Sequence, residues 1–176
     1  MYKKINVRII AIIGLLTALQ VVLSRFLSIV NIPTMKIGFG FLPILLAALI
    51  LGPLYAGIVG ALSDIIGALL FPIGTYFPGF TVTAFITGMV LGLLLQNKKK
   101  SKVQMILFAL LAVIIHQCVL SLLVDTIWIS ILYGASYIGY VISRIPEALI
   151  HAAVEFLIII LLGDRIRQLR RFLINE

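Results

Sequence analysis

Charged residues are scarce in this sequence. Only 11% of its 176 residues are Asp, Glu, Lys or Arg, whereas 62% are hydrophobic. A soluble domain typically carries about 25% charged residues, so this chain lacks the composition of a water-facing surface. The long apolar runs indicate a membrane protein, in which helices satisfy the backbone polar groups within lipid.

Several motifs that carry chemistry are also absent. The single cysteine, Cys118, excludes a disulfide framework and a cysteine-based metal site. The sequence has no G-x-x-x-x-G-K-[ST] motif, so we expect no ATP hydrolysis by this chain, and it has no G-x-S-x-G or H-E-x-x-H motif of an enzyme. We expect no cofactor. The net charge of +8 falls in short clusters beside apolar runs, which favours a lipid bilayer over nucleic acid as the partner.

Three basic clusters divide the apolar sequence. They are Lys3, Lys4 and Arg8; Lys98, Lys99, Lys100 and Lys102; and Arg165, Arg167, Arg170 and Arg171. Because such clusters face the cytoplasm, an even number of crossings must separate each from the next. The block 39–71 breaks this parity if it is one helix, and it would then span about 50 Å against a hydrocarbon core of about 30 Å. The dipeptide Gly52-Pro53 within the block predicts a turn that divides it.

We therefore expect an all-α fold, an integral membrane bundle of six transmembrane helices with both termini in the cytoplasm. Residues 1–176 are expected to form one domain, with helices over 6–29, 39–51, 54–71, 80–96, 103–132 and 139–165. This topology assigns the segments 31–38, 72–79 and 133–136 to the outer face.

The basic residues Arg25, Lys36 and Arg144 map to the outer half of the bundle, which the charge rule would deplete of cations. We interpret them as an outward-facing anion site. The alternative is that they snorkel to lipid headgroups.

Acidic residues within apolar spans are a second signal of a site. A charge at the centre of a membrane helix costs about 2.5–3.5 kcal/mol on insertion scales, so such residues usually pair or serve a function. They are Asp64, Asp125, Glu147 and Glu155. On the last helix Arg144, Glu147, His151 and Glu155 share one face by their spacing. A structural salt bridge between Arg144 and Glu147, or a metal held by His151 and Glu155, is the alternative to a binding role; two ligands alone are weak evidence for a metal.

Aromatic residues gather near the predicted outer face. An interfacial belt is their ordinary explanation. Phe77 and Phe80 flank Pro78-Gly79, however, and Trp128 follows Asp125 by one turn. These rings are candidates for stacking on a planar ligand.

The segments 23–27, 36–43, 52–53, 60–64, 76–81, 126–134 and 143–145 together resemble the folate-specific substrate-binding (S) components of energy-coupling-factor (ECF) transporters. The resemblance implies a six-helix S-component bundle that captures folate with high affinity from outside a prokaryotic cell, as a multi-pass protein of the plasma membrane. It also implies docking on a transmembrane coupling subunit that carries two ATPase subunits, through the small residues Ala11, Gly14 and Ala18.

The expected substrate-binding residues are Arg25, Lys36, Asp64, Phe77, Phe80, Asp125, Trp128, Tyr133, Arg144, Glu147 and His151. The acidic ones are candidates to accept hydrogen bonds from the pterin N–H groups, the aromatic ones to stack on the rings, and the basic ones to meet the tail carboxylates or the pterin carbonyl. An S component for thiamine, riboflavin or pantothenate, and a small membrane enzyme, are the alternatives.

Overall fold

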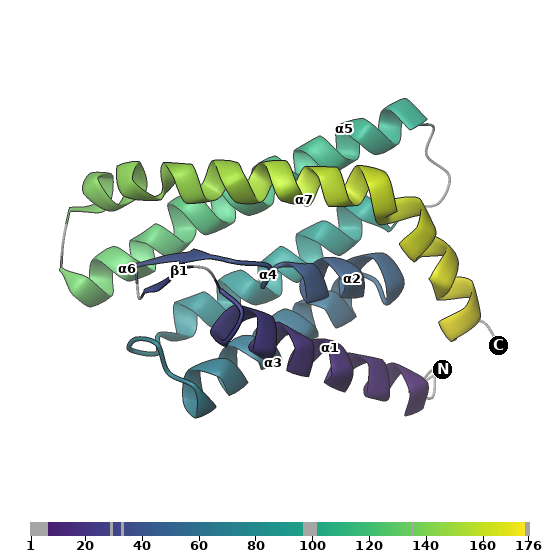
Figure 1. Ribbon diagram of the computed structural model, residues 1–176, viewed down its shortest axis with the longest axis horizontal. Coiled ribbons are helices and arrows are strands. Elements are labelled where there is room, and N and C mark those ends of the chain that lie inside the picture. The colour runs from purple at the N-terminus through teal and green to yellow at the C-terminus, as the bar shows by residue number, and fades with distance from the viewer. Residues whose placement is uncertain (1–6, 29, 33, 97–101, 135, 175–176) are drawn as a thin grey trace.

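The computed structural model of the chain describes residues 7–28, 30–32, 34–96, 102–134 and 136–174. These residues form a bundle of helices with a small hairpin at one end (Figure 1). In chain order the elements are α1 (Val7–Arg25), β1 (Val30–Ile32), β2 (Met35–Ile37), α2 (Leu42–Ile50), α3 (Pro53–Leu70), α4 (Pro78–Leu95), α5 (Lys102–Val113), η1 (Ile114–Val124), α6 (Asp125–Tyr133) and α7 (Tyr137–Ile174).

Within the described residues, five helical segments are long and apolar enough to cross a membrane. They are Val7–Arg25, Pro53–Leu70, Pro78–Leu95, Val103–Tyr133 and Tyr137–Gly163. Large apolar side chains on their outer faces, such as Leu15, Leu69 and Leu161, are exposed. Such a surface is suited to lipid rather than water, and the predicted bundle of apolar helices is confirmed.

A short hairpin connects α1 to α2. Its strands β1 and β2 pair antiparallel, with Val30 opposite Ile37 and Ile32 opposite Met35. We expected a loop over 31–38, and the hairpin within this segment corrects that detail, whereas the expected all-helical bundle stands. Strands of three residues are too short to show the alternating pattern by which a strand is identified in sequence.

The predicted turn at Gly52-Pro53 is confirmed, because α2 ends at Ile50 and α3 begins at Pro53. Gly52 has φ +104°, a conformation that is strained for residues with a Cβ atom. Proline fits the first turn of α3, where the backbone N–H has no helical partner. α2 is a helix of only nine residues, seven of them buried. At about 13 Å it is too short to span a bilayer by itself.

Glycines bring α3 and α4 close together. A Cβ atom at Gly60 would collide with the carbonyl of Ala84, and one at Gly88 would collide with the backbone of Ala56. Small residues permit this approach between membrane helices, where packing rather than water drives association. The α3–α4 pair thus forms one closely packed wall of the bundle.

The segment between α5 and α6 is a π-helix. This element, η1, has 11 residues and continues directly into α6 at Asp125. Hydrogen bonds in a π-helix join residues five apart, so side chains four or five positions apart share a face. π-helical segments occur frequently at functional sites.

The connections of the bundle fall at two ends (Figure 1). The hairpin, the α3–α4 connection and the α6–α7 connection lie at one end, on the left of the view, whereas the start of α1 and the end of α7 lie at the other. The segments that the sequence assigned to the outer face therefore lie at the same end of the bundle.

Candidate functional site

A cavity of about 320 Å³ lies among α1, α2, α3, α4, η1, α6 and α7. Its wall includes Thr34 beside the hairpin and the residues 73–76 of the α3–α4 connection, so it lies toward the hairpin end of the bundle. This size falls within the usual range for sites that bind small molecules.

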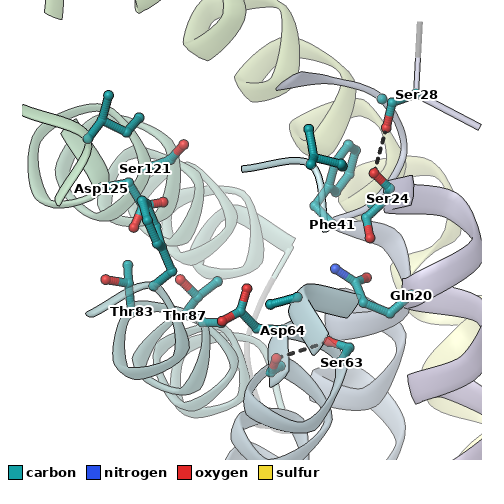
Figure 2. A pocket seen from close by; sticks show the side chains of 18 of the residues that line it. Gln20, Ser24, Ser28, Phe41, Ser63, Asp64, Thr83, Thr87, Ser121 and Asp125 are labelled. Atoms are coloured by element: carbon teal, nitrogen blue, oxygen red, sulfur yellow. Dashed lines mark hydrogen bonds between the residues drawn. The ribbon is translucent and has the colours of Figure 1, made fainter. Parts of the chain in front are cut away.

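Short polar side chains line opposite sides of the cavity. Figure 2 shows Gln20 and Ser24 of α1 on one side, and Ser121 and Asp125 of η1 and α6 on the other. The α1 residues continue in Ser28, whose hydroxyl donates to the carbonyl of Ser24 over 3.0 Å. Polar residues four positions apart therefore form a row along each of these apolar helices.

Two buried oxygens in this cavity accept no hydrogen bond from any described residue. They are Oε1 of Gln20 and Oδ1 of Asp125, and both residues line the cavity. A buried polar atom without a partner carries a desolvation penalty of about 1–3 kcal/mol. The two acceptors are thus suited to a ligand with N–H donors.

Asp64 reaches the cavity from α3 and also organises its mouth. Its Oδ2 accepts a hydrogen bond from the Thr81 hydroxyl over 2.6 Å, and Thr81 Oγ1 lies 3.1 Å from the Tyr76 hydroxyl. The chain of contacts joins α3, α4 and the connection between them. Asp64 therefore lines the cavity and also helps to fix the α3–α4 connection beside it.

Arg25, the last residue of α1, lines the cavity beside α3. A Cβ atom at Gly67 would lie only 2.8 Å from its Nε atom. Glycine at this position therefore leaves room for the guanidinium group. Because α1 ends at the hairpin end, Arg25 provides a positive charge near the cavity mouth.

Arg144 is buried and strongly engaged by neighbouring groups. It donates from Nε to Glu147 over 3.2 Å, and from Nη1 to the Ser121 carbonyl over 3.1 Å and to the Thr126 hydroxyl over 2.8 Å. The salt bridge between Arg144 and Glu147, which was the alternative to a binding role, is thus formed, and both residues also line the cavity. Much of the hydrogen-bonding capacity of this arginine is used inside the protein.

The two remaining candidates on α7 contact different elements. Nε2 of His151 accepts a hydrogen bond from the backbone N–H of Gly38 over 3.2 Å. Glu155 is fully buried, and its carboxylate contacts His116 and Gln117 of η1. Among the described residues, no group of three His, Cys, Asp or Glu side chains lies close enough together to hold a metal ion.

Trp128 packs within the protein instead of lining the cavity. Its ring lies 5.4 Å from that of Phe77, and its indole N–H donates to the Thr83 hydroxyl over 3.0 Å. Gly79 has no Cβ atom, which leaves room for the indole. Trp128 therefore connects α6 to the start of α4, and its stacking on a ligand stays a prediction.

Eight of the eleven predicted binding residues line the cavity: Arg25, Asp64, Phe80, Asp125, Tyr133, Arg144, Glu147 and His151. Phe77 and Trp128 are absent from its lining, and the side chain of Lys36 in β2 lies outside the described part of the structure. The predicted docking residues Ala11, Gly14 and Ala18 are exposed on α1. Lining residues that the sequence analysis missed include Gln20, Ser24, Ser63, Thr83, Thr87, Gln117 and Ser121.

A spacing signal was available for several of these missed residues. Gln20 and Ser24, Thr83 and Thr87, and Gln117 and Ser121 are each four positions apart within apolar spans. Uncharged polar residues are common in such helices as packing contacts, so these pairs indicate a binding site less strongly than charged residues do.

Comparison with known proteins gives a consistent assignment. Residues 8–163 match the family model described as "ECF transporter, substrate-specific component". The chain is 43% identical over 158 residues to a "Folate transporter FolT" of Clostridium novyi (strain NT), covering 88% of each sequence. It is 27% identical over 154 residues to a "Folate transporter FolT" of Leuconostoc mesenteroides subsp. mesenteroides, covering 85% of this chain and 80% of that protein.

A solved structure has the same fold. It is described as "Crystal structure of FolT bound with folic acid", and it matches with a TM-score of 0.78 and 32% sequence identity, covering 91% of this chain and 95% of that one. The family match, the sequence identity and the fold agree over nearly the whole chain. The chain therefore belongs to the substrate-specific components of ECF transporters.

Proposed function

We propose that this chain captures folate from outside the cell as the substrate-binding subunit of an ATP-driven ECF importer. The observation that carries the proposal is the cavity, in which buried acceptors are combined with an arginine at the mouth. The relatives named folate transporters, at 43% and 27% identity, support the same ligand. The chain binds substrate and is not an enzyme.

Folate has a flat pterin ring, an aminobenzoyl ring and a glutamate tail with two carboxylates. Burying two carboxylates is far less favourable than burying a neutral heterocycle, so the pterin enters first and the tail stays near the mouth. Asp125 and Gln20 then accept hydrogen bonds from pterin N–H groups, and Phe80 and Tyr133 supply aromatic surface. Of the arginines, Arg25 is better suited to the tail, because it is the last residue of α1 and lines the cavity at the hairpin end of the bundle.

The proposed topology has six crossings with both termini in the cytoplasm. It requires α2 to complete one crossing together with the non-helical residues 38–41 that precede it. Gly38, Gly40 and Phe41 line the cavity. Non-helical backbone is tolerated at membrane depth where it lines a cavity or is buried in protein, which supports this crossing.

The proposed partners are a transmembrane coupling subunit and two ATPase subunits in the plasma membrane of a prokaryote. The sequence carries no Walker motif, so ATP hydrolysis must come from partners. Gly14 and Ala18 are exposed on α1, and a Cβ atom at Gly14 would meet no atom within 4 Å. This face allows another helix to approach closely, as docking would require.

Mass spectrometry of the small molecule that co-purifies with the detergent-solubilised protein tests the proposed ligand. We expect folate or a reduced folate in wild-type protein and much less in an Asp125→Asn variant, because the amide replaces one acceptor with a donor. Recovery of another vitamin, or of equal folate from both proteins, would contradict this assignment of ligand or site.

A further inference from the structure

The cluster of His116, Gln117 and Glu155 adjoins the cavity and is not used in the folate contacts proposed above. His116 and Gln117 line the cavity, whereas Glu155 lies behind them on α7 and is 0% exposed. Gln117 Nε2 donates to Glu155 Oε2 over 2.7 Å. His116 Nδ1 lies 3.0 Å from Oε1 and 2.9 Å from Oε2 of the same carboxylate. Glu155 therefore fixes two residues of the cavity wall from behind.

The geometry indicates which group carries the proton. Nδ1 is almost equally distant from both oxygens of Glu155, as expected for one N–H shared by two acceptors rather than for an O–H that points from one oxygen. A carboxylate that is fully buried in its ionised form also requires a nearby positive charge. His116 forms an ion pair with Glu155, with Nδ1 2.9 Å from Oε2, so it supplies a compensating charge for this carboxylate. Asp125, which also lines the cavity, adds further negative charge near this ring.

The second ring nitrogen of His116 points away from Glu155. Within the described chain the imidazole meets Glu155 through Nδ1, and no hydrogen bond is found at Nε2. The amide nitrogen of Gln117 lies 3.3 Å from Nδ1 but donates to Glu155, because a protonated ring nitrogen cannot accept. Because the ring lines the cavity, an Nε2–H group is available to a ligand. This N–H group would be a hydrogen-bond donor. The buried oxygens that lack a partner in the same cavity, Oε1 of Gln20 and Oδ1 of Asp125, are acceptors.

We propose that protonated His116 donates a hydrogen bond from Nε2 to the ring carbonyl of a planar heterocyclic ligand, and that Glu155 and Gln117 position it. The inference rests on the proposed function, in which this ligand is folate. The pterin ring presents a carbonyl oxygen beside N–H groups, so the His116 donor and the Asp125 acceptor, which line the same side of the cavity, would together recognise that edge. An analogue with an amino group in place of the carbonyl would set a donor against the His116 donor, so His116 is a specificity-determining residue.

Two isosteric variants separate this role from a purely structural one. The amide nitrogen of asparagine can occupy the place of Nδ1 and keep the contact with Glu155, but it leaves no donor at the cavity. The amide of glutamine reaches the place of Nε2. Isothermal titration with folate and with its 4-amino analogue should show that the wild-type protein prefers folate. His116→Asn should bind folate roughly 10- to 150-fold more weakly and lose most of that preference, whereas His116→Gln should retain it.

Several outcomes would overturn the inference. If His116→Asn binds folate like the wild type, or weakens both ligands by the same factor, the residue does not read the carbonyl. If the folded wild-type protein binds neither compound, the proposed function itself fails, and this inference fails with it.

A second measurement needs no ligand. Nitrogen NMR of labelled histidine should show both His116 nitrogens protonated at neutral pH, and a His151→Asn variant, which leaves His116 as the only histidine of the sequence, assigns the signal. Glu155→Gln should return the ring to its neutral form, and a neutral His116 in the wild type would refute the proposal.

Discussion

The backbone N–H of Gly38 donates a hydrogen bond to Nε2 of His151 over 3.2 Å. Gly38 directly follows β2 and His151 lies on α7, so this bond joins the hairpin segment to the last helix at the cavity wall. The ring of Phe41 lies 5.7 Å from the imidazole and packs against it. Since Nε2 accepts this hydrogen bond, that nitrogen carries no proton.

We expect the Gly38–His151 bond to slow ligand release. His151→Phe keeps a ring beside Phe41 but removes the acceptor, so folate should dissociate roughly 2- to 12-fold faster, as a net hydrogen bond of about 0.5–1.5 kcal/mol implies. Stopped-flow fluorescence measures the rate. His151→Gln, whose amide oxygen can accept, is the matched control and should release folate more slowly than His151→Phe. Equal rates in wild type and His151→Phe would contradict this role.

The contact between α3 and α4 makes a prediction about stability. Gly88→Ala should destabilise the protein by about 1–3 kcal/mol, because the added methyl group collides with the backbone of Ala56. Gly14→Ala is the control, since its methyl group meets no atom within 4 Å. Thermal unfolding in detergent should show a lower midpoint for Gly88→Ala than for the wild type, and an unchanged midpoint for Gly14→Ala. Equal midpoints would show that this glycine does not set the helix separation.

The course of the helices was predictable from sequence because length, charge and turn chemistry constrained it together. Parity between the basic clusters required a division of the block 39–71, and Gly52-Pro53 supplied its place. The end of α7 was less predictable. The helix continues to Ile174, beyond the expected end at 165. The basic residues after Gly163 are compatible both with a helix outside lipid and with a loop, so the sequence did not distinguish the two. The π-helical form of η1 leaves no recognisable pattern in sequence.

The site was partly predictable for a related reason. A charge within an apolar span is conspicuous, so Asp64, Asp125 and Glu147 were found, and all three line the cavity. Whether an aromatic ring faces a ligand or a neighbouring helix depends on tertiary packing. Sequence therefore did not reveal that Trp128 bonds to Thr83 and lies against Gly79.

The proposed topology predicts opposite accessibility at two exposed positions. Thr75 lies in the α3–α4 connection and Arg165 near the end of the membrane segment of α7. In a Cys118→Ser background, a membrane-impermeant thiol reagent should label Thr75→Cys in intact cells and Arg165→Cys only after the membrane is opened. Labelling of both positions from the same side would refute six crossings.

Docking through α1 predicts a loss of assembly without a loss of binding. Gly14→Leu places bulk on an exposed face, where its Cβ atom contacts nothing in the chain itself. Co-purification with the coupling subunit should fall sharply, while folate affinity stays near that of the wild type. Ala153→Leu adds the same bulk at an exposed position of α7 and serves as the control. If Gly14→Leu assembles as well as this control, α1 is not the docking face.

The most direct test of the central claim is isothermal titration of folate into the purified chain, without ATP or partner subunits. We expect binding of one folate per chain, weakened roughly 10- to 150-fold in Arg25→Ala through loss of a charge-assisted hydrogen bond to the tail. Arg165→Ala, which removes an exposed charge outside the cavity, should bind like the wild type. A folded wild-type protein that binds no folate, or an Arg25→Ala variant with wild-type affinity, would contradict the account.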